Sequence, residues 1–172
     1  MKIVVKIILL LSIGFLNAGC DQFTKAGAKK YLKEHKTVQV VDNLFVLFLT
    51  ENGGAFLSMG KDWPDPVKWT LLVVMPLLIL LAAAGFVLVS RKVNWIQAAG
   101  FAFILGGGLS NLWDRIFHSL MVVDFMNFGI GSLTSPFRTG VMNFADLSVL
   151  IGAIVIFVSL NEKKKPDAEI PA

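Results

Sequence analysis

The chain has 172 residues, is 55% hydrophobic, and carries a formal net charge of +4. A soluble domain needs a mixed surface, so this composition argues against a soluble fold. The basic residues form no arginine-rich stripe or aromatic-interleaved patch, which argues against nucleic acid as a partner. The single cysteine, Cys20, excludes an internal disulfide. With one thiol and two histidines a zinc site is poorly supplied, and we expect no metal and no cofactor.

Four apolar runs are each close to the roughly 20 residues that a helix needs to cross a bilayer. They are Ile3–Cys20, Trp69–Val89, Trp95–Trp113 and Val141–Leu160. We therefore predict an all-α membrane protein with four transmembrane helices in one domain, residues 1–160, followed by a cytoplasmic tail, residues 161–172. The first helix should continue past Cys20 to Tyr31, and Pro76 should produce a kink or a local packing adjustment.

The first twenty residues also have the pattern of a bacterial lipoprotein export signal. A basic start precedes the apolar stretch Ile7–Phe15, and small residues lead to Cys20, the possible lipid acceptor. Asn17, however, stands three residues before the cysteine, where an aliphatic side chain is usual, and three further spans follow. We therefore favour a retained first helix over a structural lipoprotein anchored through Cys20.

Between the first two spans the residue composition changes. Val38–Val41 and Leu44–Leu49 are rich in β-branched and aromatic residues, and the turn dipeptide Asp42-Asn43 separates them. This pattern predicts a small strand pair on the membrane surface, which ends in the glycine-rich segment Glu51–Gly54.

The loop between the second and third spans predicts the orientation in the membrane. It contains Arg91 and Lys92, and positive charge in a short loop favours the cytoplasm. Four spans would return both termini to that side. Polar residues from several segments would then meet at the outer face, which indicates one site: Asp21, Asn52, Asn111, Arg115, Asp124, Asn143 and Asp146.

Two aspartates, Asp124 and Asp146, lie at the edges of apolar segments. A carboxylate at membrane depth costs several kcal/mol unless it is paired or hydrated, so it suggests a functional site. Two neighbouring acids would repel, and one would hold a proton near neutral pH. One acid and one base around a water molecule are what an aspartyl hydrolase needs.

Simpler interpretations exist for both residues. Asp124 could be a loop residue that caps a turn, and Asp146 could stabilise the start of a helix through its dipole. A small membrane transporter subunit could instead use Asp124 and Asp146 as a proton relay. That alternative predicts acids near the bilayer midplane, whereas these lie near one edge.

The third span carries a polar pair and a run of glycines. Asn111 and Arg115 are four residues apart on one helical face, and Arg115 could hold a carboxylate, a substrate carbonyl or a lipid phosphate. Gly106–Gly108 let a helix or a lipid chain approach closely. We expect them to frame, with the Asn52 loop, a groove for lipid chains.

Five segments in order resemble the bacterial lipoprotein signal peptidase (signal peptidase II) family. They are Asp21–Lys25, Asn52–Phe56, Gly106–Arg115, Val122–Phe125 and Asn143–Asp146. The departures are small. The second segment lacks a second alanine before Phe56, and Gly108 and Ser110 replace residues that are commonly alanine and glycine.

The resemblance implies an aspartyl endopeptidase of the inner membrane that cleaves diacylglyceryl-modified prolipoproteins just before the lipidated cysteine. It implies an outer-face β-cradle at about residues 37–58, and an active site that faces the periplasm or cell exterior. Lipidated prolipoproteins and membrane lipids would be the partners, and we expect a monomer. Asp124 and Asp146 match the catalytic pair. The positions that match the substrate site are Asn52, Gly54, Asn111, Arg115 and Asn143, and the supporting positions are Asp21 and Lys25.

Overall fold

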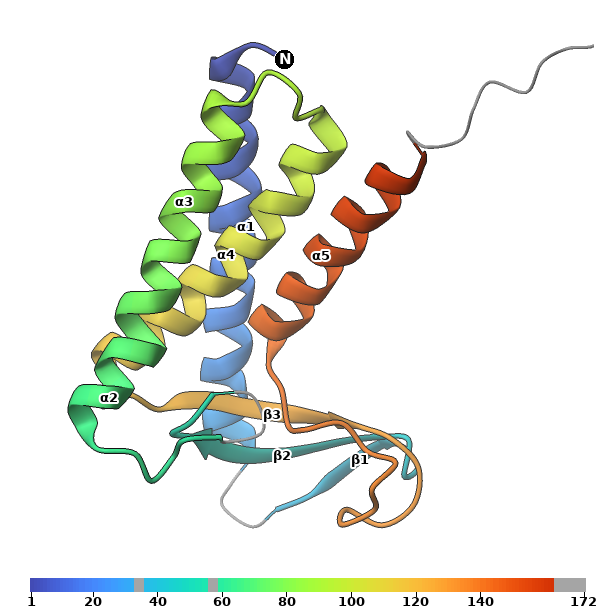
Figure 1. Cartoon of the computed structure of the whole chain (residues 1–172). Coiled ribbons are helices and arrows are strands. Elements are labelled where there is room, and N and C mark those ends of the chain that lie inside the picture. Colours follow the sequence, from blue (N-terminus) through green and yellow to red (C-terminus); the bar gives the residue numbers. More distant parts are fainter. Residues whose placement is uncertain (33–35, 56–58, 163–172) are drawn as a thin grey trace, which may run out of the picture.

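Helices standing side by side, with a small sheet across one end, make up the computed structural model (Figure 1). It describes residues 1–32, 36–55 and 59–162. The elements in chain order are α1 (Ile3–Tyr31), β1 (Val38–Val41), β2 (Phe45–Asn52), α2 (Asp65–Trp69), the π-helical turn η2 (Thr70–Val74), α3 (Met75–Val89), α4 (Trp95–Phe117), β3 (Val122–Phe128) and α5 (Phe144–Glu162).

Helix α1 continues past Cys20 to Tyr31, as predicted. Its 29 residues rise by about 43 Å at 1.5 Å per residue. The hydrocarbon core of a bilayer is about 30 Å thick, so the helix is long enough to cross it and extend beyond. The last turns of α1 pass the sheet (Figure 1), and α1 contacts both β2 and β3.

The second apolar run forms the continuous helical segment α2, η2 and α3, with Pro76 inside it. A proline has no N–H for the carbonyl one turn earlier, and its ring crowds that carbonyl. Here the helix widens into the π-helical turn η2 immediately before Met75 and Pro76, and the Met75 N–H bonds to the Thr70 carbonyl. The predicted local adjustment is confirmed, and it is a π-helical turn.

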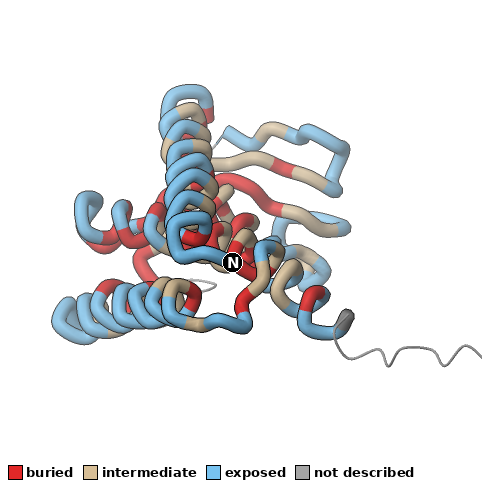
Figure 2. Tube along the Cα trace, turned by 90° about the horizontal axis from the view of Figure 1, so that it is seen from above, coloured by how far each residue is buried: buried red, intermediate tan, exposed pale blue. Residues whose placement is uncertain are grey.

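Three helical segments in the described part of the chain are long and apolar enough to cross a membrane. They are Ile3–Tyr31, Asp65–Val89 and Phe144–Asn161. Their outward surfaces are exposed and their inward surfaces buried (Figure 2), and many of the exposed side chains are large and apolar. Helix α4, the predicted third span, is not among the three, because polar residues such as Gln97 and Asp114 interrupt its apolar sequence.

The three consecutive glycines of α4, Gly106–Gly108, pack the helices together. A Cβ on Gly106 would lie 2.7 Å from the Gly14 carbonyl of α1, and one on Gly108 would lie 2.8 Å from Leu80 of α3. A Cβ on Gly107 would likewise collide with the Ala145 carbonyl of α5. Because backbone atoms fill the space at Gly106 and Gly107, the expectation that these two glycines frame a lipid groove is wrong, whereas Gly108 faces only the end of the Leu80 side chain.

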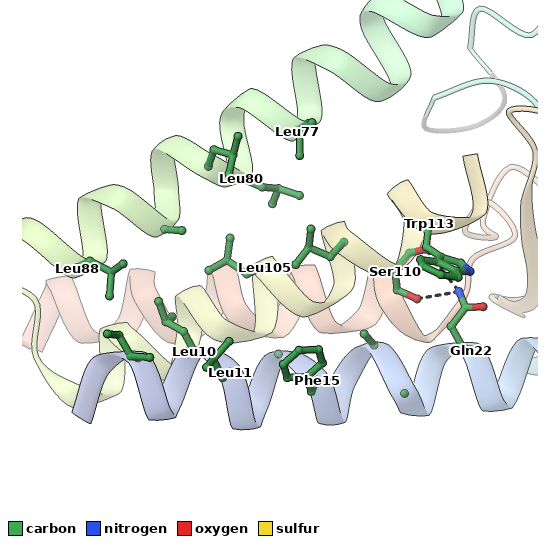
Figure 3. Close-up of a pocket in the computed structure, with 17 residues that line it drawn as sticks. Leu10, Leu11, Phe15, Gln22, Leu77, Leu80, Leu88, Leu105, Ser110 and Trp113 are labelled. Atoms are coloured by element: carbon green, nitrogen blue, oxygen red, sulfur yellow. Dashed lines mark hydrogen bonds between the residues drawn. The ribbon is translucent and has the colours of Figure 1, made fainter. Parts of the chain in front are cut away.

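An apolar groove of about 600 Å³ lies elsewhere, between α1, α3 and α4 (Figure 3). Leucines line most of its length, including Leu10, Leu80 and Leu105. Its polar residues are Gln22 and Ser110, which hydrogen-bond to each other at one end.

The sheet has three antiparallel strands in the order β1-β2-β3. The first two are the predicted pair, although β2 continues to Asn52 and so includes part of the predicted glycine-rich end. Strand β3 was not predicted, and the interpretation of Asp124 as a loop residue is wrong because Asp124 lies within this strand. A tight turn with positive φ at Ser119 and Leu120 connects α4 directly to β3.

Candidate active site

Asp124 and Asp146 come from different elements and are linked through asparagine amides. Asp124 lies on β3, where its two oxygens accept hydrogen bonds from Asn143 Nδ2 at 2.7 Å and Asn52 Nδ2 at 3.1 Å. Asp146 lies in the first turn of α5, and its oxygens accept from Asn111 Nδ2 at 2.9 Å and the Asn143 backbone N–H at 3.1 Å. Each of the four carboxyl oxygens therefore accepts one N–H, and Asn143 bonds to both acids.

The start of α5 explains how Asp146 is held. Asn143 Oδ1 accepts the Asp146 backbone N–H at 3.0 Å, while Asp146 Oδ2 accepts the Asn143 N–H. This reciprocal pattern is that of a capping box, with aspartate at the third position of the helix. Asn143 thus caps α5, and the same bonds orient Asp146 within the site.

Burial changes the acidity of Asp124, whose side chain is only 2% exposed. Loss of solvation is the main reason that its pKa is raised, and the neighbouring Asp146 adds to the rise. The amides of Asn52 and Asn143 partly offset these effects, and the resulting pKa is about 6. Asp124 is therefore a carboxyl that can bind and release a proton close to the pH at which enzymes work.

We expect this carboxyl to make the stability of the protein depend on pH. The folded-state pKa is above the usual 3.8, so Asp124 stabilises the fold fully below about pH 4, and this contribution disappears as the pH rises through about 6. The pKa difference corresponds to about 3 kcal/mol. Unfolding temperatures of wild type and Asp124→Asn should be measured from pH 4.5 to 7.5. The wild-type protein should lose stability relative to the variant across that range, and a constant difference would contradict the assigned pKa.

A buried cluster of charges lies behind the Asn111 amide. The Lys25 ammonium is 2.6 Å from Asp21 Oδ2, 2.8 Å from Asp114 Oδ2 and 2.9 Å from Asn111 Oδ1. Asn111 Oδ1 also accepts from Asn143 Nδ2 at 3.1 Å. Because two donors face this oxygen, the amide nitrogen must point toward Asp146. Lys25 therefore fixes the orientation of the Asn111 amide.

Asp21 connects this cluster to the start of α5. Its Oδ1 accepts the Ala145 backbone N–H at 2.8 Å, one residue before Asp146, and its Oδ2 accepts from the Ser110 hydroxyl at 2.7 Å. Gln22 donates to Asp114 Oδ1 at 2.9 Å. Asp21 thus holds an N–H of the first helical turn that would otherwise be buried without a partner.

The sequence suggested that Arg115 could hold a carboxylate, but no carboxylate of the described residues pairs with it. Among the described residues its guanidinium donates to backbone carbonyls, those of Leu120 at 2.6 Å, Asn52 at 3.4 Å and Gly54. It is 9% exposed, so it does not reach lipid phosphates either. Arg115 clamps the turn before β3 against the end of β2.

This clamp also holds the amide that faces Asp124. Asn52 Oδ1 accepts the Gly54 N–H at 3.0 Å, which closes a turn after β2, and leaves Asn52 Nδ2 directed at Asp124. Arg115 and Gly54 therefore act on the dyad indirectly, through the position of Asn52.

One hydrogen-bonded network contains every predicted site residue. It joins Asp21, Lys25, Asn52, Gly54, Asn111, Arg115, Asp124, Asn143 and Asp146. Sequence reasoning did not single out Asp114, Ser110 and Gln22, which complete the network. A signal for Asp114 was present, because it is an acid one turn beyond Asn111 within an apolar helix.

Known proteins resemble this chain over most of its length. The sequence model of the signal peptidase (SPase) II family matches residues 13–161. A lipoprotein signal peptidase of Treponema denticola is 31% identical over 153 residues, which cover 86% of this chain and 88% of the relative. One from Sulfurihydrogenibium sp. (strain YO3AOP1) is 33% identical over 154 residues, with 89% and 90% covered.

A solved structure shares the fold. A bacterial membrane enzyme determined at 2.3 Å superposes with a TM-score of 0.76 at 23% identity, over 95% of this chain and 93% of that one. The residues that the family model matches include both aspartates and all of the surrounding network. The chain belongs to the signal peptidase II family.

Proposed function

We propose that the protein is an aspartyl endopeptidase that removes the signal peptide from diacylglyceryl-modified prolipoproteins, with cleavage just before the lipidated cysteine. The observation that carries the proposal is the pair of carboxyls, Asp124 and Asp146, joined through Asn143. Membership of the signal peptidase II family supports the reaction. The proposed site comprises Asp124 and Asp146 as catalytic residues with the asparagines around them.

In the proposed reaction the two carboxyls have different tasks. We assign the proton to Asp124, because burial raises its pKa, and this proton polarises the scissile carbonyl. Asp146 removes a proton from water, whose oxygen then attacks the carbonyl carbon. The tetrahedral intermediate collapses as the C–N bond breaks, and the departing amine takes a proton from the dyad. No metal or cofactor takes part in this scheme.

The asparagines differ in what they can offer the substrate. Both N–H groups of the Asn143 side chain are occupied, by Asp124 Oδ1 and Asn111 Oδ1. Asn111 Nδ2 donates one N–H to Asp146, and in the described structure its second N–H has no protein partner. We therefore propose Asn111 as the donor to the developing oxyanion, and Asn143 as a positioning residue.

We further propose that α4 also crosses the bilayer, as the third of four spans in chain order, although its hydropathy is low. It packs between α1, α3 and α5, so its polar residues can be buried in protein rather than lipid. Lys6 donates to the Val87 and Ser90 carbonyls at 2.7 and 2.5 Å, which places the start of α1 beside the positive loop. This arrangement supports an inner-membrane protein with both termini in the cytoplasm and the dyad outside.

The remaining parts of the expected architecture are also proposals. We propose a monomer surrounded by membrane lipids, with residues 1–160 as one domain. The cytoplasmic tail was expected at residues 161–172, and residues 163–172 lie outside the described part, as does Phe56 of the second family segment. The proton-relay alternative is not supported, because Asp124 lies on the sheet at one end of the helices rather than midway along them.

Lipid recognition provides the test of this function. We expect the purified protein to cleave a precursor without diacylglycerol at a small fraction of the rate for the lipidated precursor. Each CH₂ group that is buried contributes about 0.8 kcal/mol, so even partial burial of the acyl chains exceeds the roughly 1–3 kcal/mol available from one side-chain pocket.

The measurement is the rate of signal-peptide release from the two precursors under the same conditions. A chelator should leave both rates unchanged. Equal rates on the two precursors would indicate a general membrane protease, and loss of activity that metal restores would indicate a metalloenzyme.

A further inference from the structure

The start of α1 and the loop between α3 and α4 meet at the end of the helices away from the sheet (Figure 1). Lys6 of α1 is buried there, and its ammonium donates to the Val87 and Ser90 carbonyls at 2.7 and 2.5 Å. Both acceptors are neutral, and among the described side chains no carboxylate lies within ion-pair distance of Lys6. An ammonium has three N–H donors, so one donor and the positive charge are left for a ligand.

Lys6 lines a cavity of about 440 Å³ between α1 and the loop that follows α3. The other polar side chains that line it are Ser90 and Arg91, and none of its described lining residues is acidic. Ile3 and Val89 lie beside these groups and are 56% and 84% exposed, on helix surfaces that lipid covers when the helices span a membrane. Two cations bordered by apolar side chains complement the phosphate of an anionic lipid headgroup.

The cavity adjoins the apolar groove between α1, α3 and α4. Leu88 lines both, and it lies at the end of the groove opposite Gln22 and Trp113 (Figure 3). On α1, Ile3 of the cavity and Ile7 of the groove are one turn apart and share a helical face.

The groove is long enough for an acyl chain. The part of α1 that lines it, from Ile7 to Gln22, is about 22 Å long at 1.5 Å per residue. One leaflet contributes about 15 Å to the hydrocarbon core of a bilayer. A chain whose headgroup occupies the cavity can therefore lie along the groove for the whole depth of its leaflet.

We propose that the cavity and the groove together bind one anionic phospholipid, from the leaflet on the side away from the sheet. Its phosphate accepts hydrogen bonds from Lys6 and Arg91 and balances the charge of the buried ammonium. One of its acyl chains covers the leucines of the groove, which removes apolar surface from solvent. Neither Asp124 nor Asp146 lines the groove or the cavity, so this lipid site is distinct from the proposed catalytic site.

Native mass spectrometry of the purified protein in detergent tests the binding. We expect one copy of dioleoyl phosphatidylglycerol to bind at least about tenfold more tightly than dioleoyl phosphatidylcholine, whose choline cation would face Lys6 and Arg91. Deacylated glycerophosphoglycerol should not compete, because it lacks the chain that fills the groove. Equal affinity for the two lipids would overturn the headgroup assignment. Competition by the deacylated compound at equal concentration would overturn the role of the groove.

Matched variants test the two parts of the site. Arg91→Gln and Lys6→Met should each weaken the binding of phosphatidylglycerol about tenfold. Lys92→Gln changes an exposed cation in the same loop that does not line the cavity, and it should leave the affinity unchanged. Ala84→Phe would fill part of the groove and should also weaken binding. Ala82→Phe, at an exposed position of α3 outside the groove, is its control.

The variants also separate lipid binding from helix capping. Lys6→Met removes two bonds to the end of α3 and can lower the unfolding temperature by itself, so the exposed Arg91 provides the second test. If the preference for phosphatidylglycerol persists in Lys6→Met, the lysine only caps a helix and the site is overturned. Equal weakening by Arg91→Gln and Lys92→Gln, or by the two phenylalanine variants, would also overturn it. None of these measurements uses cleavage, so their outcome is independent of the proposed function.

Discussion

Replacing Asp124 or Asp146 by asparagine is expected to abolish cleavage, with a loss of at least about 10²–10⁴-fold from the missing acid or base alone. The substitution keeps the size of the side chain but removes either the shared proton or the group that accepts a proton from water. Both oxygens of Asp124 accept hydrogen bonds from N–H groups. In the asparagine variant, the new NH₂ group would face one of these donors, and that hydrogen bond would be lost. The rate of signal-peptide release by the purified variants is the measurement.

Three control variants test whether the loss of cleavage is specific to the dyad. Asp42→Asn changes an exposed aspartate in the turn between β1 and β2, where the φ of 39° also suits asparagine. Cys20→Ser and His118→Gln remove the thiol and an exposed imidazole that the mechanism does not use. All three should retain activity. Near-normal turnover by either dyad variant, or a folded but inactive Cys20→Ser protein, would contradict the aspartyl mechanism.

Replacing Lys25 by methionine is expected to destabilise the protein by about 3–5 kcal/mol, because it leaves buried carboxylates without their counter-ion. Lys25 is 3% exposed and lies within 2.8 Å of both Asp21 and Asp114. The change also removes one of the two donors that orient the Asn111 amide. The unfolding temperature in detergent and the cleavage rate should therefore both fall.

Lys29→Met is the matched control, because Lys29 is exposed one turn further along α1. It should leave both measurements unchanged. The triple variant Asp21→Asn/Lys25→Met/Asp114→Asn removes all three charges and should recover part of the lost stability. If Lys25→Met unfolds at the wild-type temperature, the buried cluster does not contribute as described.

The sequence by itself was sufficient for the features that depend on local composition. The thickness of the bilayer sets the length of each spanning helix independently of the others. The approximate lengths of α1, of the continuous segment α2–η2–α3 and of α5 could therefore be predicted. The π-helical turn before Pro76 and the cap at Asn143 also follow from neighbouring residues. The five family segments predicted which polar residues come together in one network, because their types and order are specific even without contacts.

Only the tertiary structure decided how those residues are connected. Arg115 binds backbone carbonyls, which every residue has, so no sequence pattern could indicate its partners. The bond from Asp21 to the Ala145 N–H joins residues 124 positions apart. Strand β3 was not predicted because it forms by pairing with β2, which is distant in the sequence. The role of Gly107 was predicted wrongly because the backbone of α5 occupies the place that a side chain at this position would take. Such long-range contacts depend on the packing of whole helices, which a single sequence does not display.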